Sequence, residues 1–305
     1  MDIAIMVEGQ NGLTWPRWQR IARAVEDLGF TGLYRSDHFT NAGPPDKDSL
    51  ELWTSLTWLA THTRRLTFGP LVTPCSFRHP VMTARMATAV DELSGGRLVL
   101  GMGAGWQERE HSNYGFDLLS LPERMQRFHE SLQVVTRLFT SDEPLTFPGR
   151  FYRLQESVLL PRPRPGGPPI LVGGNGLKRT LPLAAQFAVE WNATFQAPAS
   201  FQRLSSRLDG LVRREQRDPR AVRRSMMTGV VFGRSAGEVA ERLARRGRSA
   251  EDLRSRGILI GTGEKVVEQL GELAAAGLQG IMLQWLDLDD LDGLEGLARS
   301  VLGRV

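Results

Sequence analysis

Short apolar runs alternate with longer segments of helical spacing along most of the chain. Residues 2–7 are apolar after the first position, and residues 15–28 then place apolar side chains three and four positions apart, up to Gly29. The first pattern predicts a buried strand, and the second predicts an amphipathic helix that ends at a glycine. We expect strands at 2–7, 31–36, 66–73, 98–100, 170–172, 191–195, 226–232 and 280–285, and helices at 15–28, 50–61, 79–93, 122–139, 177–188, 201–217, 236–245, 264–276 and 291–302.

This order of elements is typical of a parallel α/β fold. Eight strands that alternate with helices, in a chain a little longer than about 250 residues, fit a single (β/α)8 TIM barrel. We expect one such domain over residues 1–305, with a doubly wound open sheet as the alternative. The alternation breaks between residues 145 and 160, where Pro148-Gly149 separates two short runs and predicts a small inserted hairpin.

Glycines occupy every second position after the run 98–100, at Gly101, Gly103 and Gly105. Because glycine has no side chain, a flat or anionic ligand could approach the backbone closely there. A tight strand-to-loop corner without a ligand is the other interpretation. The dinucleotide-binding fingerprint is excluded, since no third glycine follows at its offset and no helix begins at once. Trp106, directly after these glycines, could stack on a flat ring.

A second glycine-rich segment, Gly173-Gly174-Asn175-Gly176, stands directly before a predicted helix. Backbone N–H groups and the positive end of a helix dipole bind phosphate. Lys178 and Arg179 fall in the first predicted turn, where a cation is unfavourable unless an anion lies nearby. The segment therefore predicts a phosphate site, with a simple strand-to-helix turn as the alternative.

Functional side chains of a (β/α)8 barrel lie at the carboxyl ends of its strands. Asp37 and His38 follow the second predicted strand, Val72 and Thr73 end the third, and residues 103–106 follow the fourth. These stretches could converge on one mouth. A histidine at such a position either transfers a proton near neutral pH or makes a structural hydrogen bond.

The net charge is positive, but basic and acidic residues are mixed along the chain. The formal charge is +4, which raises nucleic acid as a partner. Arginines cluster at 213–224 and 245–248, and acidic residues are interleaved with them. We therefore expect solvated helix faces and no nucleic-acid partner.

Cysteine and histidine usage excludes two kinds of site. Cys75 is the only cysteine, so no internal disulfide can form, and a reducing compartment is the simpler expectation. The five histidines lack metal-ligand spacing, so we expect no metal. No basic region precedes the first apolar run, and no apolar stretch approaches the roughly 20 residues of a membrane span. We expect a cytoplasmic protein that enters no membrane.

Several short motifs occur in a fixed order along the chain. They are Ser36-Asp37-His38-Phe39, Val72-Thr73 followed by Arg78-His79-Pro80, Asp91-Glu92-Leu93-Ser94-Gly95-Gly96-Arg97, Gly101-Met102-Gly103-Ala104-Gly105-Trp106, Glu123-Arg124, Gly173-Gly174-Asn175-Gly176 and Trp191-Asn192. Together they resemble the bacterial-luciferase-like family, and within it the branch of coenzyme F420 (deazaflavin)-dependent oxidoreductases. The specific motifs cover roughly residues 1–195, and the remainder matches more loosely.

The resemblance implies a TIM-type barrel that holds a flavin or 5-deazaflavin ring at its mouth. It implies that His38 faces the ring and is the catalytic residue, and that a non-prolyl cis peptide near Val72-Thr73 supports one ring face. It also implies that the loop 173–176 binds the cofactor phosphate. The cofactor-binding residues expected in this way are Asp37, His38, Val72, Thr73, Gly103, Ala104, Gly105, Trp106, Gly173, Gly174, Asn175 and Gly176.

Two departures from the family pattern bear on the substrate. The sugar-phosphate dehydrogenases of the family carry a glutamate at the position of Trp106, so that proton donor is missing here. Family members also often have Tyr-Ala-Asp-Gly-Trp-Asn where this chain has Phe187-Ala188-Val189-Glu190-Trp191-Asn192, which moves an acidic group by one position.

The leading hypothesis is therefore a hydride-transferring, F420-dependent oxidoreductase acting on a small organic substrate. An FMN-dependent monooxygenase is the alternative, because a phosphate loop serves either cofactor. A cofactor-binding barrel without catalysis is an alternative of another class. By resemblance we also expect a homodimer.

Overall fold

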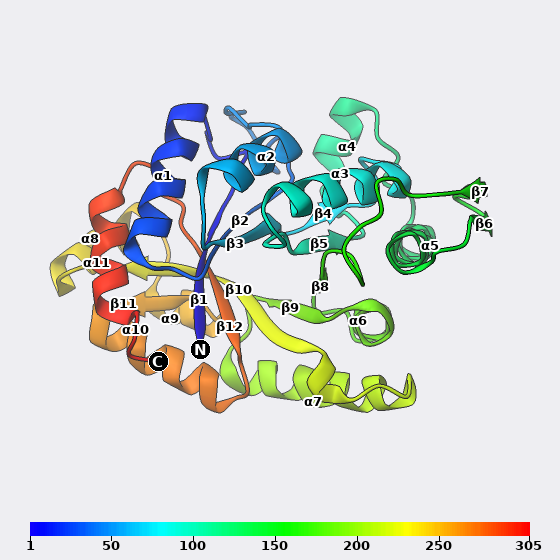
Figure 1. Ribbon diagram of the computed structural model, residues 1–305. Coiled ribbons are helices and arrows are strands. Elements are labelled where there is room, and N and C mark those ends of the chain that lie inside the picture. Colours follow the sequence, from blue (N-terminus) through cyan, green and yellow to red (C-terminus); the bar gives the residue numbers. More distant parts are fainter.

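A computed structural model describes residues 1–305, and its parallel strands form a barrel with helices around it (Figure 1). The barrel strands are β1 (Asp2–Val7), β2 (Gly32–Arg35), β3 (Thr67–Pro70), β4 (Thr73–Pro74), β5 (Leu100–Gly103), β8 (Ile170–Gly173), β9 (Glu190–Thr194), β10 (Arg223–Phe232) and β12 (Gly280–Gln284). Their order is β3-β2-β1-β12-β10-β9-β8-β5-β4. A bridge between Phe68 and Leu98 joins β3 to the segment before β5 and closes the circle. The TIM-barrel prediction is confirmed, and the open-sheet alternative is wrong.

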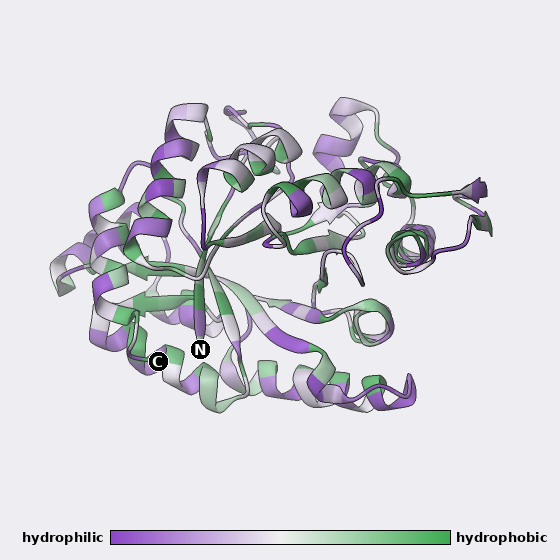
Figure 2. Cartoon of the chain, viewed as in Figure 1, coloured by the Kyte–Doolittle hydropathy of each residue, from purple (hydrophilic) through white to green (hydrophobic).

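The helices lie outside the barrel, and hydrophobic and hydrophilic stretches alternate along their ribbons (Figure 2). The helix residues that are buried are mainly apolar. The sequence pattern missed two short helices, α4 (Glu108–Tyr114) and α9 (Ala250–Ser255). It placed the start of α6 (Thr180–Phe187) three residues too early, at Leu177. Gly29 ends the first helix with a φ of 91°, as its C-terminal glycine predicts. The helices are α1 (Trp15–Leu28), α2 (Leu52–His62), α3 (Pro80–Leu93), α4 (Glu108–Tyr114), α5 (Leu121–Thr140), α6 (Thr180–Phe187), α7 (Pro198–Arg214), α8 (Ala236–Arg246), α9 (Ala250–Ser255), α10 (Gly263–Ala275) and α11 (Leu291–Val301).

The third barrel strand is interrupted, whereas the sequence predicts one continuous strand. Its two parts, β3 and β4, are separated by Leu71-Val72, and the peptide bond between these two residues is cis. The resemblance placed a cis bond near Val72-Thr73, so the position is corrected by one residue. Thr73 already pairs with Met102 of β5, and the break therefore lies before it. Thr73-Pro74 is not among the cis bonds.

Two smaller sheet features lie outside the barrel circle, and the sequence predicted only the first of them. The inserted hairpin consists of β6 (Leu145–Pro148) and β7 (Arg153–Ser157), which pair antiparallel and project from the edge of the molecule (Figure 1). The apolar run 258–261 forms β11 (Leu259–Gly261), which pairs with the end of β10 outside the barrel circle. Neither feature interrupts the barrel.

Glycines allow the strands to approach closely where the barrel closes. A Cβ on Gly69 would overlap the carbonyl oxygen of Val99, and a Cβ on Gly101 would overlap that of Pro70. Only glycine fits such positions, because the obstacle is backbone and cannot rotate away. The tight-corner interpretation therefore accounts for Gly101.

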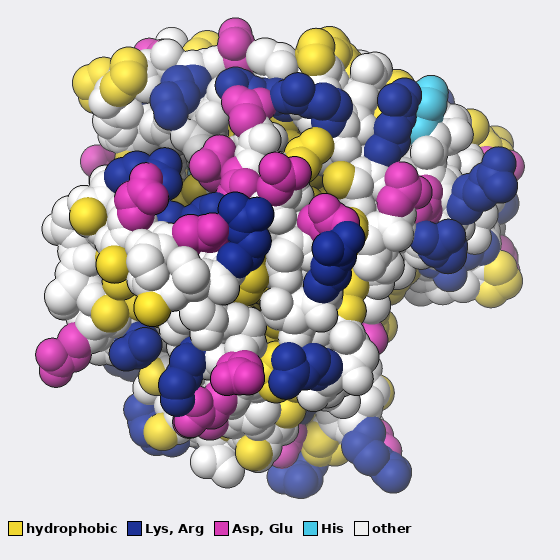
Figure 3. Space-filling model, turned by 90° about the vertical axis from the view of Figure 1, so that its left-hand side faces the viewer, with side chains coloured by type: hydrophobic (Ala, Val, Ile, Leu, Met, Phe, Trp, Pro, Cys, Tyr) yellow, Lys and Arg dark blue, Asp and Glu magenta, His cyan; other side chains and the backbone are white.

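Charges of both signs are mixed on the face that carries α8 to α11 (Figure 3). Several arginines of this region pair with acidic neighbours, as Arg234 does with Glu238 and Arg248 with Asp252. These pairs fit the expectation of solvated helix faces. No helix combines the length and the apolar composition required to cross a bilayer, and no group of three or more candidate metal ligands occurs.

Candidate active site

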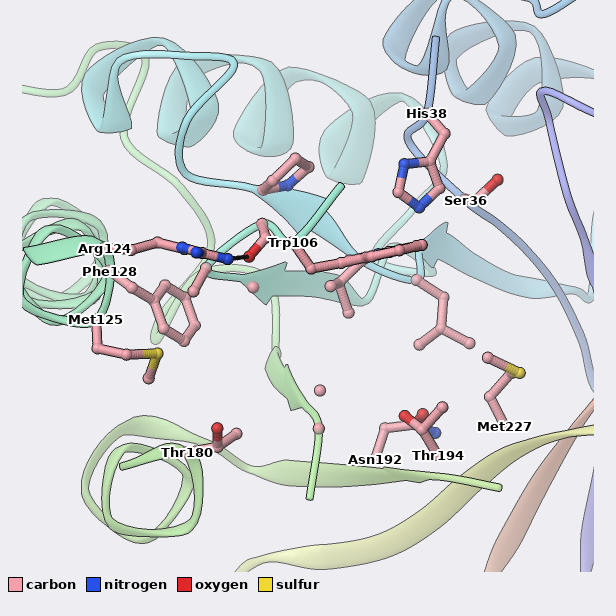
Figure 4. A pocket seen from close by; sticks show the side chains of 18 of the residues that line it. Ser36, His38, Trp106, Arg124, Met125, Phe128, Thr180, Asn192, Thr194 and Met227 are labelled. Carbon is pink, nitrogen blue, oxygen red and sulfur yellow. Dashed lines mark hydrogen bonds between the residues drawn. The ribbon is translucent and has the colours of Figure 1, made fainter. Parts of the chain in front are cut away.

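A cavity of about 500 Å³ opens at the carboxyl ends of the barrel strands. It is bounded by the strand-end segments after β1, β2, β5, β8 and β9, and by one face of α5 (Figure 4). Of the predicted residues, His38, Val72, the run Gly103–Trp106 and Gly173-Gly174 line it. The structure therefore brings these four strand ends to a common mouth.

His38 is held by a buried carboxylate that the sequence did not reveal. Its Nδ1 lies 2.8 Å from Oε1 of Glu110, whose side chain is 1% exposed. The second carboxylate oxygen accepts the N–H of Phe39 at 3.0 Å. Because a carboxylate only accepts, Nδ1 carries the proton, and Nε2 is left to exchange protons with a ligand.

Burial disfavours the charged form of His38, but nearby carboxylates more than offset this effect. Burial lowers the pKa of His38, while the hydrogen bond and charge of Glu110 raise it, and the net result is a pKa above the ordinary value. Glu8, another cavity residue, contributes in the same direction. Its carboxylate accepts from Gln10 at 2.9 Å and from Gln284 at 2.6 Å, so it is fixed at the end of β1.

The outer wall of the cavity is mainly apolar. Met125 and Phe128 point inward from α5, on the side opposite His38 (Figure 4). Trp106 is 62% exposed, and its ring meets the His38 ring edge-on with centroids 5.7 Å apart. Arg124 donates to the carbonyl of Gly105 at 2.9 Å and so anchors the loop after β5 to α5. A large flat aromatic surface therefore stands beside the proton-exchanging group.

Val72 occupies the space that two glycines leave free. A Cβ on Gly103 would lie 2.5 Å from Cγ2 of Val72, and a Cβ on Gly173 would lie 2.9 Å from its Cγ1. The valine side chain therefore rests on both glycines and presents its surface to the cavity together with Leu71. The glycines after β5 and β8 thus shape an apolar wall.

Asp37 and Thr73 do not line the cavity. The Asp37 carboxylate accepts from the Thr73 hydroxyl at 2.7 Å and pairs with Arg78 at 2.5 Å. These contacts tie β4 to the segment after β2. The two residues support the wall that carries Val72 and His38.

Asn175 and Gly176 also lie outside the cavity lining, but their backbone N–H groups are unpaired. The Asn175 side chain makes two hydrogen bonds to the backbone of Thr194, at 2.7 and 3.0 Å. The N–H groups of residues 175–180 donate to no acceptor within the chain. Lys178 and Arg179 precede α6 and are exposed. A run of unpaired donors next to two cations is suited to an anion.

Sequence reasoning missed the roles of several cavity residues. Glu110 lies on α4, a seven-residue helix too short to give a periodic pattern. Glu8 lies just beyond the first predicted strand, where the strand-end rule would have indicated it. Arg124 and Asn192 stood in the quoted motifs without a role, and both line the cavity.

Comparisons with known proteins agree with this architecture. The model of the luciferase-like monooxygenase family matches residues 1–280. The chain is 32% identical over 191 residues to the 4-hydroxyprotoasukamycin monooxygenase of Streptomyces nodosus subsp. asukaensis, covering 62% of this chain and 48% of that protein. It is 29% identical over 168 residues to the F420-dependent glucose-6-phosphate dehydrogenase of Amycolatopsis mediterranei, covering 54% and 47%. The chain thus spans about half the length of the curated relatives it matches.

Solved structures share the fold at low sequence identity. An F420-dependent secondary alcohol dehydrogenase in complex with an F420-acetone adduct superimposes with a TM-score of 0.87 at 18% identity, covering 98% of each chain. A long-chain alkane monooxygenase superimposes with a TM-score of 0.80 at 16% identity, covering 98% of this chain and 90% of that one. With the family match over residues 1–280, these comparisons show that the chain belongs to the luciferase-like monooxygenase family.

Proposed function

We propose that this chain is an F420-dependent oxidoreductase that transfers a hydride between the deazaflavin and a small organic substrate. Curated relatives named as F420-dependent enzymes support the cofactor. The observation that carries the proposal is the His38–Glu110 pair at the cavity, because hydride transfer to or from an oxygen-bearing carbon requires a proton to move as well.

The residues present fit a planar cofactor that carries a phosphate. Leu71 and Val72 form an apolar wall, and Trp106 adds a flat aromatic surface. Thr180 lines the cavity at one end of the run of free N–H groups, so an anion bound to those groups would be continuous with the cavity. The proposed phosphate site is therefore the free N–H groups of residues 175–180, which include Asn175 and Gly176, while Gly173 and Gly174 line the adjoining part of the cofactor cavity.

His38 is the proposed catalytic residue. When bound, F420 supplies the carbon that gives or receives the hydride. Nε2 of His38 takes up a proton from a substrate hydroxyl or returns it to a carbonyl oxygen, while Glu110 fixes the ring and stabilises its charged form. We propose that Asp37 and Thr73 act indirectly, by holding the segments that carry His38 and Val72.

An FMN-dependent monooxygenase is the second candidate. The relative that is 32% identical carries a monooxygenase name, and this chain has Trp106 where the sugar-phosphate dehydrogenases carry glutamate. An anion site of backbone N–H groups serves either cofactor, since FMN also bears a phosphate. The two candidates differ in cofactor and share the site.

Separate titrations of the protein with F420 and with FMN, followed by fluorescence quenching, test the proposal. Saturable F420 binding that exceeds FMN binding supports the deazaflavin enzyme. Tight FMN binding without F420 binding supports the monooxygenase instead. Binding of neither cofactor contradicts both.

We also propose an oligomeric state and a cellular location for this protein, and we propose that it has no nucleic-acid partner. The family resemblance supports a homodimer in the cytoplasm, and the paired surface arginines support the absence of a nucleic-acid partner. Sedimentation equilibrium at micromolar concentration tests the dimer, and a monomer mass would contradict it.

A further inference from the structure

Glu8 is a carboxylate of the cavity that takes no direct part in the proposed chemistry. It is half-buried, follows β1 directly and lines the cavity. The proposed proton exchange requires only His38 and its partner Glu110. The contacts of Glu8 indicate what this second carboxylate is suited to bind.

A chain of hydrogen bonds on one side of Glu8 favours its ionised form. The Ser36 hydroxyl accepts the N–H of Gly9 at 2.8 Å and donates its own hydrogen to Oε1 of Gln10 at 2.7 Å. Because Oε1 of Gln10 accepts that hydrogen, its Nε2 is the atom that donates to Oε2 of Glu8, at 2.9 Å. The direction of each bond in the chain therefore leads to an acceptor at Glu8.

The other oxygen of Glu8 also accepts an amide hydrogen. Nε2 of Gln284 donates to Oε1 at 2.6 Å from β12, which pairs with β1 on the side opposite β2. Both oxygens thus receive N–H groups, as suits an ionised carboxylate, and neither donor carries a charge. A carboxylate has about four acceptor positions, so two remain for a ligand.

No positive side chain compensates the charge of Glu8. It forms no ion pair with any arginine, lysine or histidine of the chain. Arg124 is the only arginine or lysine in the cavity lining, and it lies across the cavity from Ser36 and His38 (Figure 4). Because water is partly excluded from the cavity, the carboxylate attracts a positive group more strongly than it would in bulk water.

Glu8 stands next to the place of the proposed proton exchange. It follows β1, and His38 follows β2, which pairs with β1. Neighbouring strands lie about 5 Å apart, and the charge of Glu8 contributes to raising the pKa of His38. A group bound to Glu8 would therefore be only a few bonds away from a hydroxyl that meets Nε2 of His38.

We propose that Glu8 binds a protonated amine of the substrate, so that the substrate is an amino alcohol or the corresponding amino ketone. The inference rests on the proposed function, since it places the reacting hydroxyl or carbonyl at His38. It names a charged group of the substrate, which the proton exchange at His38 does not specify.

Two alcohols of the same shape test this contact: 2-amino-1-phenylethanol and 1-phenyl-1-propanol. The first carries an ammonium group where the second carries a methyl group. Neither can be oxidised while the protein holds reduced F420, so calorimetry measures both dissociation constants without turnover. Their ratio is determined for the unmodified protein and for Glu8→Gln and Asp287→Asn. Asp287 is an exposed acid after β12 and outside the cavity lining, so its variant is the matched control for the loss of one negative charge.

We expect the unmodified protein to bind the amine more tightly than the neutral alcohol. Glu8→Gln should reduce this preference about tenfold to a hundredfold, the value of one hydrogen bond to a charged group. Asp287→Asn should change the preference less than about twofold, because solvent screens an exposed charge.

An amine that does not bind, an equal affinity for the two alcohols, or a preference that Glu8→Gln leaves unchanged overturns the inference and leaves the proposed function intact. An unchanged preference together with a lower pKa of His38, followed by NMR titration, would show that Glu8 acts on His38 alone. If Glu8→Gln does not fold, Glu8→Ala is measured with the same expectation. Failure of F420 to bind the unmodified protein overturns the proposed function and this inference together.

Discussion

Nδ1 of His38 and Oε1 of Glu110 lie 2.8 Å apart, in a pair of which the glutamate is almost completely buried. The two residues come from different elements, His38 from the segment after β2 and Glu110 from α4. The pair fixes which imidazole nitrogen bears the proton and which one meets the cavity. It also raises the pKa of His38 above the 6.5 that is ordinary for histidine, despite the opposing effect of burial.

Glu110→Gln should destabilise the protein in a pH-dependent way. The pKa of His38 is raised in the folded state, so its contribution to stability is fully present below the unfolded value of 6.5 and is lost as the pH rises through the folded value. We expect the variant to lose about 2 kcal/mol of unfolding free energy at pH 6 and less at pH 9. Urea unfolding at the two pH values measures this. An equal loss at both would show that His38 is not charged by this pair.

His38→Ala should abolish substrate-dependent turnover while cofactor binding stays within a few-fold. His38 contributes a proton, and the anion contacts lie elsewhere in the site. His62→Ala is the control, because His62 is an exposed histidine at the end of α2. Unchanged turnover in His38→Ala would show that His38 does not transfer a proton. If the unmodified protein binds the cofactor but shows no turnover, the non-catalytic alternative is favoured.

Thr180→Val should weaken binding of the phosphorylated cofactor more than binding of its phosphate-free chromophore. The substitution removes a hydroxyl next to the free N–H groups of residues 175–180 and keeps the side-chain shape. We expect a loss of about tenfold for F420. Thr140→Val, at the end of α5, is the matched control. Equal losses for both ligands would place the phosphate elsewhere.

Gly69→Ala should destabilise the barrel at its closure. The added Cβ would overlap the carbonyl oxygen of Val99, which belongs to the backbone of the neighbouring segment. We expect a loss of about 3 kcal/mol or more in the free energy of unfolding. Gly210→Ala, on α7 with open space around it, should instead raise stability by up to about 1 kcal/mol. Similar effects of the two substitutions would contradict the close contact of Gly69 with the backbone of Val99.

The sequence predicts the barrel well because each of its strands is marked by local pattern. Apolar runs and helical periodicity locate the elements within a few residues, and Gly29 marks a helix end. The interruption at Leu71-Val72 was not predicted, although Pro70 lies directly before it and a proline argues against a continuous central strand. The bend depends on how β4 pairs with β5, which is a tertiary contact.

The candidate site was predictable only where function coincides with a strand end. His38 and Gly173 follow strands, and so the barrel rule indicated them. Glu110 acts across 72 positions of sequence, and nothing local marks it as the partner of His38. Asn192 lines the cavity from β9, but its hydrogen bond to Ser225 requires the register of β9 against β10. Spacing along the chain carries no such information.

A crystal structure with F420 bound tests the central claim most directly. We expect the deazaflavin ring in the cavity, with Nε2 of His38 facing it and the phosphate on the N–H groups of residues 175–180. A ring bound at another surface, with the cavity left without a ligand, would contradict it.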